Sequence, residues 1–258
     1  MKHEEPALEI VRIPYEGEEI IGYLRVPPSD LPPPVVVLTG GVDTWKSDIE
    51  AQSKAVLAEG MAAFTFDMPG TGESAWPLSP DGERVYSRVL EYLKTRPDLD
   101  GDRMAVHLQS FAGYYAVKLA VLDPNVKAAV NVGGPIHRSF TLEHAENVHE
   151  GMVKTIAHAM GESLDQSIAE MIAKIEPFSL ERQGLLKAPK RQAPLLSING
   201  DQDELVTIDD LYIISESGIV QEEWVYEGDG HCASGNASEH VPKAAAWIKA
   251  QLSRAGQS

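Results

Sequence analysis

Apolar and polar residues alternate in the first part of the chain. The alternation runs over residues 8–13 and again over residues 20–26, and a short turn, Glu16-Gly17-Glu18, separates the two runs. A period of two places alternate side chains on opposite faces of a strand. Residues 8–26 are therefore predicted to form an antiparallel hairpin. The prolines at positions 27, 28 and 32–34 then give a stiff connector.

Beyond the connector the alternation stops, and continuous apolar runs follow one another with helical segments between them. The runs lie at residues 35–38, 62–66, 103–108, 126–132, 194–198 and 219–226. Helices are predicted at residues 48–58, 80–94, 112–122 and 238–252, the second with Ser79 as its N-cap and Pro80 at its first position. Apolar strands separated by helices indicate a parallel sheet covered on both faces. The sequence thus predicts an α/β fold: one domain over residues 1–258 with a mostly parallel central sheet flanked by helices.

One stretch, residues 137–190, interrupts this rhythm because it contains no convincing strand. Ser163-Leu164-Asp165-Gln166 matches a helix capping box, and apolar residues recur at helical spacing after it, at positions 168, 171, 172 and 175. The stretch is predicted to be a helical insertion between two core strands. Such helices either belong to the core or form a lid over a site, and the position of the insertion favours a lid.

Charge and composition narrow the classes of function. The 258 residues include 22 Lys and Arg against 39 Asp and Glu, a formal net charge of −17. A negative field repels nucleic acid and anionic lipid, so neither is expected as a partner, although surplus acid also simply keeps a protein soluble. No apolar run is long enough to span a membrane, and residues 1–6 lack the apolar core of a signal peptide. With one cysteine, Cys232, and hence no intramolecular disulfide, we expect a cytoplasmic protein.

Ser110 lies where a predicted strand meets a predicted helix. This is the context of a nucleophile elbow, a tight turn that lifts a serine hydroxyl above the sheet edge. The next amide, of Phe111, lies at a helix N-terminus and can donate to an oxyanion. Leu108 and Ala112 replace the two glycines of the G-x-S-x-G pattern, so a serine that merely caps a buried helix is the alternative. Leu108 is expected to lie in the core beneath the serine, because Ala112 and Gly113 leave room for it.

Two later segments offer an acid and a base. Asp203 follows one predicted strand, and His231 follows the last one. The chain order serine, aspartate, histidine is that of the α/β-hydrolases, so Ser110, Asp203 and His231 are the predicted catalytic triad. Asp203 could instead cap a turn and His231 could be an ordinary loop residue, and Asp201 is the alternative acid.

A second oxyanion donor is expected from the loop after the first parallel strand. Thr39-Gly40-Gly41-Val42-Asp43 forms this loop. Paired glycines let the backbone approach closely, so the amide of Gly41 or Val42 can turn toward the nucleophile. A plain tight turn is the alternative.

Five segments together resemble the FrsA-like branch of the α/β-hydrolases, which includes dihydroxypseudooxynicotine hydrolase and fungal polyketide-shortening hydrolases. They are residues 39–46, 66–73, 110–116, 200–204 and 228–232, and the similarity covers nearly everything after Val35. The Gly-Gly-x-Asp loop and the Gly-x-His-Cys ending are its most particular motifs. The resemblance implies the α/β-hydrolase fold, with Leu108 in place of the family's usual glycine.

Three functions are compatible with these residues. The first is hydrolysis of carboxylic esters or lactones through an acyl-enzyme, with no cofactor and no metal. The second, which the resemblance implies, uses the same triad to cleave a carbon–carbon bond in ketones or β-diketones. It needs a proton donor in the pocket, for which His137, Arg138 and Glu143 are candidates. The third is a non-catalytic binding protein. Asp43 and Trp45 complete the predicted substrate pocket, the expected partner is a small molecule, and a homodimer is left open.

The remaining candidates are interpreted as structural. Cys232 is expected to be a small buried side chain that points away from the base, and His107 a buried histidine with satisfied hydrogen bonds. Gly70-Thr71-Gly72 lacks the lysine of a phosphate loop. A cluster in the insertion lacks the spacing of a helical zinc site and is predicted to be a solvated helix face: His144, Glu146, His149 and Glu150.

Overall fold

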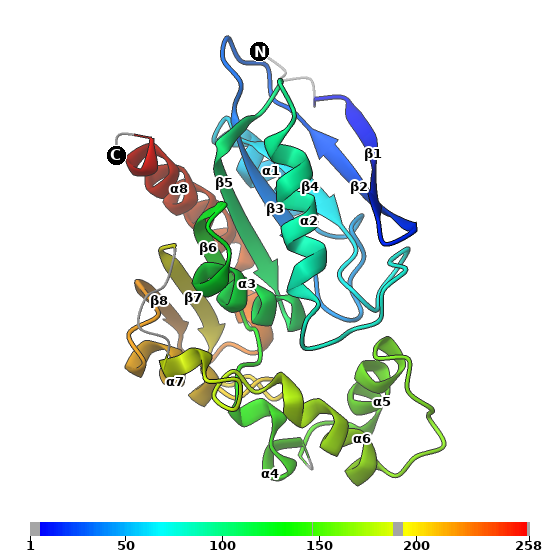
Figure 1. Ribbon diagram of the computed structural model, residues 1–258. Helices are drawn as coiled ribbons and strands as arrows, with labels where there is room; N and C mark the ends of the chain where they lie inside the picture. Colours follow the sequence, from blue (N-terminus) through cyan, green and yellow to red (C-terminus); the bar gives the residue numbers. More distant parts are fainter. Residues whose placement is uncertain (1–5, 146, 188–192, 257–258) are drawn as a thin grey trace.

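The computed structural model describes residues 6–145, 147–187 and 193–256. Residues 1–5, which enter the signal-peptide argument, and residues 188–190 of the predicted insertion lie outside this part. An eight-stranded sheet runs through the molecule in the order β1-β2-β4-β3-β5-β6-β7-β8, with helices on both faces (Figure 1). Its strands are Leu8–Tyr15 (β1), Glu18–Arg25 (β2), Pro34–Thr39 (β3), Ala62–Phe66 (β4), Asp100–Gln109 (β5), Val126–Val132 (β6), Leu195–Gly200 (β7) and Glu222–Tyr226 (β8).

Strand direction divides the sheet into a hairpin edge and a parallel body. The hairpin β1–β2 joins the sheet through antiparallel pairing of β2 with β4, and every pair from β4 through β3 to β8 is parallel. The half-exposed hairpin alternates, whereas β3 and β4 are buried at every position. The predicted α/β fold with a mostly parallel sheet is therefore confirmed.

Helices cover the two faces of the sheet in separate layers. Helices α1 (Glu50–Ala58) and α8 (Ala237–Ala255) pack on one face, and α2 (Glu83–Lys94) and α3 (Phe111–Leu122) on the other. Side chains of β5 alternate between the layers, since Val106 and Leu108 join the α2–α3 cluster and Ala105 joins the α1–α8 cluster. In the described residues no helix combines the length and the apolar character that crossing a membrane requires.

Two local predictions were wrong in detail. Helix α2 begins at Glu83, not after Ser79, because the carbonyls of Ser79 and Pro80 accept hydrogen bonds from Tyr115 and Tyr114 on α3. Residues 80–82 consequently form a turn. Helix α7 (Asp209–Glu216) was not predicted at all, since it is only two turns long.

The segment between β6 and β7 is helical, and none of its described residues forms a strand. It lies beyond the carboxyl ends of the parallel strands, at the bottom of Figure 1. The predicted capping box at Ser163 is displaced by one turn: Ser167 and Glu170 make both reciprocal hydrogen bonds at the start of α6, whereas Ser163 closes a preceding turn. The helical elements of the segment between β6 and β7 are Arg138–Phe140 (η1), Leu142–Ala145 (α4), Glu150–Ala159 (α5), Ile168–Ile175 (α6), Glu176–Phe178 (η2) and Leu185–Lys187 (η3).

Candidate active site

The turn between β5 and α3 holds Ser110 in an unusual backbone conformation. Its φ of 56° and ψ of −135° lie where a side chain is rarely tolerated. The amide of Ser110 donates to the carbonyl of Val132 at 2.8 Å, which fixes the turn against the end of β6. The next amide, of Phe111, occupies the first position of α3 and so has no partner within the helix. The sequence thus builds a sharp strand–turn–helix elbow with a free donor beside the serine.

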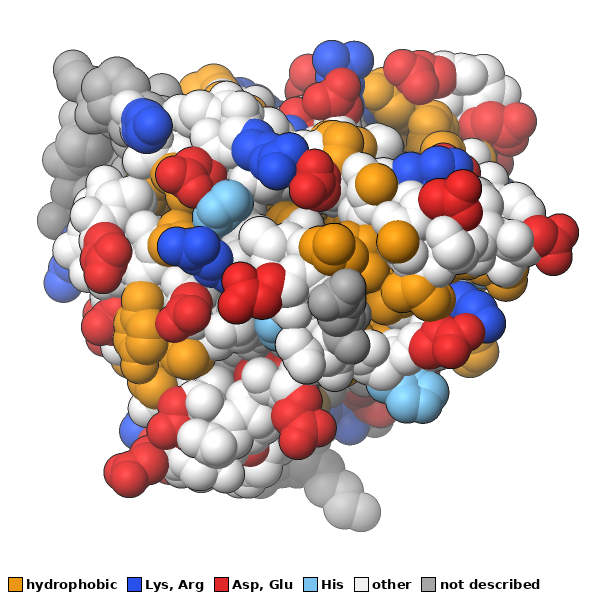
Figure 2. Space-filling model, turned by 90° about the horizontal axis from the view of Figure 1, so that it is seen from below, with side chains coloured by type: hydrophobic (Ala, Val, Ile, Leu, Met, Phe, Trp, Pro, Cys, Tyr) orange, Lys and Arg blue, Asp and Glu red, His pale blue; other side chains and the backbone are white. Residues whose placement is uncertain are grey.

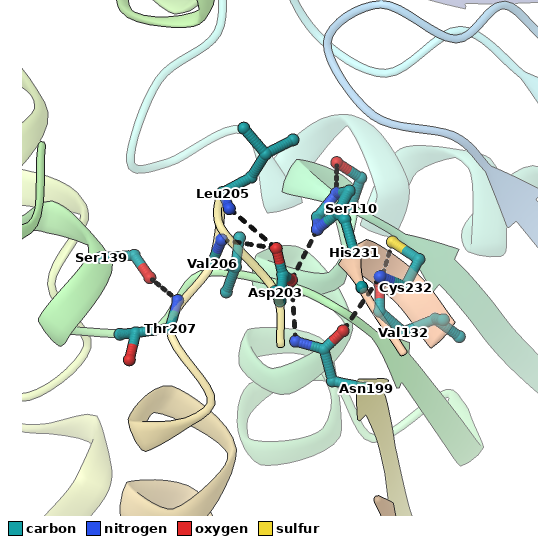
Figure 3. Close-up of polar contacts among 12 residues, drawn as sticks. Ser110, Val132, Ser139, Asn199, Asp203, Leu205, Val206, Thr207, His231 and Cys232 are labelled. Atoms are coloured by element: carbon teal, nitrogen blue, oxygen red, sulfur yellow. Dashed lines mark hydrogen bonds and ion pairs between the residues drawn. The ribbon is translucent and has the colours of Figure 1, made fainter. Parts of the chain in front are cut away.

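Three side chains form a continuous hydrogen-bond chain across the carboxyl end of the sheet (Figure 3). His231 Nε2 lies 2.8 Å from Ser110 Oγ, and His231 Nδ1 lies 2.7 Å from Asp203 Oδ2. Asp203 Oδ1 accepts from the amides of Leu205 and Val206 at 2.8 and 3.0 Å. The structure thus brings together the three predicted triad residues, from loops after β5, β7 and β8.

Asn199 joins the acid loop to the histidine loop. Its Nδ2 donates to Asp203 Oδ2 at 2.9 Å, and its Oδ1 accepts from the amide of Cys232 at 2.9 Å. No sequence argument identified Asn199 as part of the site, because its role depends on the pairing of two distant loops. Its place at the end of a buried strand, four residues before the acid, was the available signal.

Burial and the polar or charged neighbours shift the pKa of Asp203 in opposite directions, and the same holds for the pKa of His231. Burial alone raises the pKa of Asp203, but hydrogen bonds from His231 and from neighbouring amides outweigh it, so this pKa is lowered. Burial lowers the pKa of His231, but Asp203, together with Cys232, outweighs it, so this pKa is raised above 6.5. A carboxylate that stabilises an imidazolium lets the histidine accept a proton from the serine.

Asp201 does not contact the histidine in this arrangement. Its carboxylate accepts from the amide of Gly228 at 2.7 Å and from the side chain of Gln202 at 3.3 Å. It therefore closes the turn between the two loops, and the geometry favours Asp203 over the alternative acid.

The glycine loop after β3 lies directly against the nucleophile. A Cβ atom on Gly41 would come within 2.6 Å of Ser110 Cβ and 2.7 Å of its Oγ, so only glycine allows this approach. Lys46 anchors the loop, because its buried Nζ lies 2.6 Å from carboxylate oxygens of both Asp67 and Glu73. Its backbone amide also donates to Asp67 at 2.7 Å. This ion cluster joins two of the sequence motifs into one wall beside Ser110.

Leu108 is fully buried in the apolar cluster between the sheet and α3, as predicted. The tight approach of helix to sheet occurs instead at Gly113. A Cβ there would lie 2.2 Å from Asn131 Oδ1 and 2.8 Å from the Cα of Gly134. In the G-x-S-x-G pattern the glycine before the serine allows helix and strand to approach closely. Here the close approach lies at the first turn of the helix after Ser110, which explains why a leucine fits two residues before it.

A small, mainly apolar cavity of about 60 Å³ lies beside Ser110 and His231. The helical insertion supplies much of its wall, and the rest comes from the elbow and from the loops after β3, β6 and β7. Four of its residues were predicted site residues, but the sequence did not identify the wall residues from the insertion and from the loops after β6 and β7, since their convergence depends on how the insertion folds back. The cavity is lined by Val42, Ser110, Phe111, Pro135, Ser139, Phe140, Val148, Met152, Val153, Ile156, Ile175, Leu205, Val206 and His231.

None of the five residues predicted for the substrate pocket lines this cavity. Asp43 is exposed, and Trp45 lines an adjoining cleft. Arg138 and Glu143 line a separate surface cleft of about 600 Å³ beside α4 and α7.

The fifth residue, His137, has both ring nitrogens engaged away from the cavity. Its Nδ1 lies 2.7 Å from Ser179 Oγ, and its Nε2 lies 2.7 Å from a carboxylate oxygen of Glu181. Its backbone amide donates to Asp210, a buried carboxylate on α7 that accepts from four successive amides at the start of the insertion. His137 therefore serves to hold the insertion in place.

Of two expectations about buried groups, one was partly wrong. Cys232 is buried as predicted, and its Sγ donates to the Val132 carbonyl at 3.3 Å. His107 is buried in the α1–α8 layer, yet neither ring nitrogen has a hydrogen-bond partner in the described part of the chain.

The histidine and glutamate cluster of the insertion was predicted to be a solvated face, but two of its members are structural. His144 Nε2 lies 3.0 Å from the Leu205 carbonyl, and His149 caps α5 by accepting from the amide of Gly151. Glu150 pairs with Lys154 on the surface. Glu146 lies outside the described residues.

A serine after β5, an acid after β7 and a histidine after β8, on a parallel sheet with helices on both faces, define the α/β-hydrolase class. Within that class the chain belongs to the FrsA-like family, since the sequence model described as Esterase FrsA-like matches residues 6–252. The predicted resemblance is thus confirmed.

The sequence identity to individual relatives is low. The chain is 28% identical to Esterase FrsA of Vibrio cholerae serotype O1 over 207 residues, which cover 78% of this chain and 49% of that protein. It is 31% identical to Esterase FrsA of Escherichia coli O157:H7 over 205 residues, with 78% and 49% covered. The chain therefore spans about half the length of the curated relatives it matches.

Solved structures support the fold. The 2,6-dihydroxy-pseudo-oxynicotine hydrolase superposes with a TM-score of 0.84 at 22% identity, covering 96% of this chain and 68% of that one. AbyA5 superposes with a TM-score of 0.79 at 21% identity, covering 98% and 72%. At these identities the likeness is one of fold.

Proposed function

We propose that the chain is a serine hydrolase that cleaves carboxylic esters, lactones included, through an acyl-enzyme. The observation that carries this proposal is the hydrogen-bond chain from Ser110 through His231 to Asp203, with lengths of 2.8 and 2.7 Å. Membership of a family described as esterase-like supports the same class of reaction.

In the proposed reaction His231 Nε2 takes the proton of Ser110 as Oγ attacks the substrate carbonyl. Asp203 holds the imidazole in the required orientation and stabilises its positive charge. The imidazolium then protonates the leaving alcohol, which departs and leaves an acyl-serine. Water enters, His231 removes its proton, and the acid is released.

The negative oxygen of each tetrahedral intermediate needs donors that are already in place. The amide of Phe111, free at the start of α3, is the first. The second comes from Gly41 or Val42, because the loop backbone passes directly against Ser110. The ion cluster around Lys46 keeps that loop fixed, so little reorganisation accompanies the reaction.

The geometry supports an ester hydrolase better than either alternative. Cleavage of a carbon–carbon bond needs an acid beside the departing carbanion, and none of the three candidates, His137, Arg138 and Glu143, lines the cavity. A binding protein without catalysis would not require the aligned triad or the backbone conformation of Ser110.

We also propose that the helical insertion is a lid. Its start is held by Asp210, and the end of α5 by a hydrogen bond from the Leu78 amide to the Ala159 carbonyl at 2.8 Å. Met152 and Ile156 of α5 and Ile175 of α6 narrow the cavity to about 60 Å³, whereas ligand pockets ordinarily have about 300–1,000 Å³. Hydrogen exchange tests this: phosphonylation of Ser110 should slow exchange in α5 and α6, and unchanged rates would make the insertion a fixed wall.

A fluorophosphonate probe tests the hydrolase itself. The native protein should be labelled at Ser110, and Ser110→Ala should lose both labelling and ester turnover by several orders of magnitude while keeping its unfolding temperature. Ser139→Ala is a matched control, because Ser139 lines the same cavity but does not contact His231. Labelling that persists in Ser110→Ala would disprove the assignment.

A further inference from the structure

The cavity at Ser110 is small for a substrate site. Its volume of about 60 Å³ lies well below the about 300–1,000 Å³ of ordinary ligand pockets, so a short substituent suits it better than a bulky one. An ester carbonyl carries two substituents, one on the acyl side and one on the alcohol side. If one substituent occupies this cavity, the other has to leave the nucleophile in a different direction.

A larger and more open cleft of about 470 Å³ lies on the other side of Val42. Val42 lines both spaces and belongs to the loop that contributes to the proposed oxyanion hole. A substrate whose carbonyl oxygen is bound at this loop therefore has one substituent directed past Val42. The cleft is bounded by the loop after β3, by residues 70–77 and by the end of α5.

Two indoles give this cleft its chemical character. Trp45 is 59% exposed, although large apolar side chains gain by burial, and Trp76 is half-buried. The backbone of Trp45 is fixed on both sides, because its amide donates to Asp48 and its carbonyl accepts from the Asp48 amide. Trp76 is held by the ring of Tyr15, with centroids 5.2 Å apart, and by a hydrogen bond from Nε1 to Glu16.

The cleft also differs in charge from the protein as a whole. The chain has a formal net charge of −17, yet the described residues that line this cleft include no Asp, Glu, Lys or Arg, and His158 is their one histidine. A charged ligand would find no fixed partner there. Flat apolar faces beside glycine backbone suit a neutral aromatic group.

We propose that this Trp45–Trp76 cleft binds a neutral aromatic alcohol portion of the substrate, while a short acyl group occupies the cavity at Ser110. This assignment rests on the proposed hydrolase function. The acyl group stays bonded to Ser110 until water releases it, which suits the cavity beside Ser110, the less open of the two spaces. The alcohol has to leave before that water enters, which suits the open cleft.

Paired substrates test the assignment. The native protein should hydrolyse 2-naphthylmethyl acetate, whose leaving group is a primary alcohol like ethanol, with a higher kcat/KM than ethyl acetate, and than methyl 2-naphthoate, which places the ring on the acyl side. Trp45→Ala should lower kcat/KM for 2-naphthylmethyl acetate by about 3- to 10-fold, mainly through KM, and should lower it far less for ethyl acetate, whose alcohol portion has no ring. Trp45→Phe should keep most of the activity, since it retains an aromatic face.

Tyr212→Ala is the matched control, because Tyr212 is also an exposed aromatic residue, at 40%, and lines the separate cleft beside α4. Equal losses on both acetates, a loss in Tyr212→Ala as large as in Trp45→Ala, or a preference for the naphthoate would overturn the assignment. Circular dichroism confirms that each variant is folded.

Failure of the hydrolase proposal is recognised separately, by absence of fluorophosphonate labelling and of turnover on every ester. Calorimetric titration with 2-naphthol then tests whether the Trp45–Trp76 cleft binds an aromatic alcohol, independently of catalysis. Saturable binding that Trp45→Ala weakens and Tyr212→Ala does not would support it. Absence of binding, or equal binding by all three proteins, would overturn it.

Discussion

At the scale of single residues, backbone strain is concentrated at the proposed catalytic centre. In the described residues four non-glycine residues have positive φ, and three of them are Ser110, Cys232 and Ala233, with φ of 56°, 60° and 47°. Each such residue costs about 1–3 kcal/mol unless its surroundings hold it. Hydrogen bonds supply that support: from the Ser110 amide to Val132, from the Cys232 amide to Asn199, and between His240 and the Ala233 carbonyl. The fold thus stores strain where it positions Ser110 and His231.

Substitution of each aspartate in the loop after β7 should show which of the two is the acid of the proposed triad. Asp203→Asn should lower kcat by about 10⁴-fold, because an amide favours the wrong histidine tautomer. Asp201→Asn should lose far less, since Asp201 closes a turn with Gly228 and does not contact His231. Steady-state kinetics on one ester measure both. Equal losses would show that the acid is not yet identified.

The same variant should change the pH profile. Activity requires neutral His231, so it rises with pH through the pKa of His231, which Asp203 raises. Removing the carboxylate removes the largest raising influence, and the acidic limb of kcat/KM should shift to lower pH in Asp203→Asn. An acidic limb at the same pH in both proteins would mean that another group controls it.

Leu108 is a stability residue in this arrangement. Leu108→Gly should lower the free energy of unfolding by about 2–5 kcal/mol, because it leaves a cavity in a fully packed cluster and adds chain entropy. Leu108→Met, which conserves volume, should cost less than about 1.5 kcal/mol. Urea unfolding beside an ester assay measures both. Unchanged stability with faster turnover in Leu108→Gly would instead identify leucine as an obstacle in the elbow.

At the scale of elements, the predictable part of the molecule is the part that local sequence specifies. Continuous apolar runs predicted which segments of the chain are the parallel strands, and turns after strands predicted the triad. The wall of the cavity could not be predicted, because Met152 and Ile156 reach it only through the way α5 folds back over the sheet. The start of α2 was misplaced for a similar reason, since tyrosines from α3 hold the carbonyls before it. Local pattern is informative until tertiary contacts compete with it.

The loops after β3 and β4 are held together by one buried cation, the ammonium group of Lys46. Lys46 has only 5% of its side chain exposed and neutralises Asp67, whose side chain is 3% exposed. Lys46→Met leaves that carboxylate buried without a counterion, which should cost about 3–5 kcal/mol of unfolding free energy and loosen the oxyanion loop, lowering kcat. Lys54→Met is the control, because the pair of Lys54 with Glu50 is half exposed and worth less than about 1 kcal/mol. Equal melting temperatures of the two variants would contradict this role.

At the scale of the whole molecule, acidic side chains are scattered across the face that carries the insertion. Viewed from the side of the insertion, acidic side chains surround a patch of hydrophobic ones near the middle of the face (Figure 2). The net charge of −17 still disfavours anionic partners. A cytoplasmic location and a homodimer stay predictions.

The stability of the whole fold should depend on His107 as the pH falls. Burial, with a smaller contribution from nearby His240, lowers the pKa of His107 to about 3, against 6.5 for an exposed histidine. Below pH 6.5 the unfolded chain binds a proton here that the folded chain rejects. The stability that neutral His107 provides is therefore complete above pH 6.5 and is lost progressively toward pH 3, by up to about 5 kcal/mol.

His107→Leu should remove this dependence, because leucine fills much of the space and leaves no ring nitrogen unpaired between α1 and α8. Free energies of unfolding from urea titrations at pH 7, 6, 5 and 4 should fall more steeply in the native protein than in His107→Leu, while carboxylate titration affects both alike. His158→Gln, an exchange of an exposed histidine, should follow the native curve. Parallel curves for native protein and His107→Leu would mean that His107 is solvated or partnered in solution, and that acid acts on the fold through other groups.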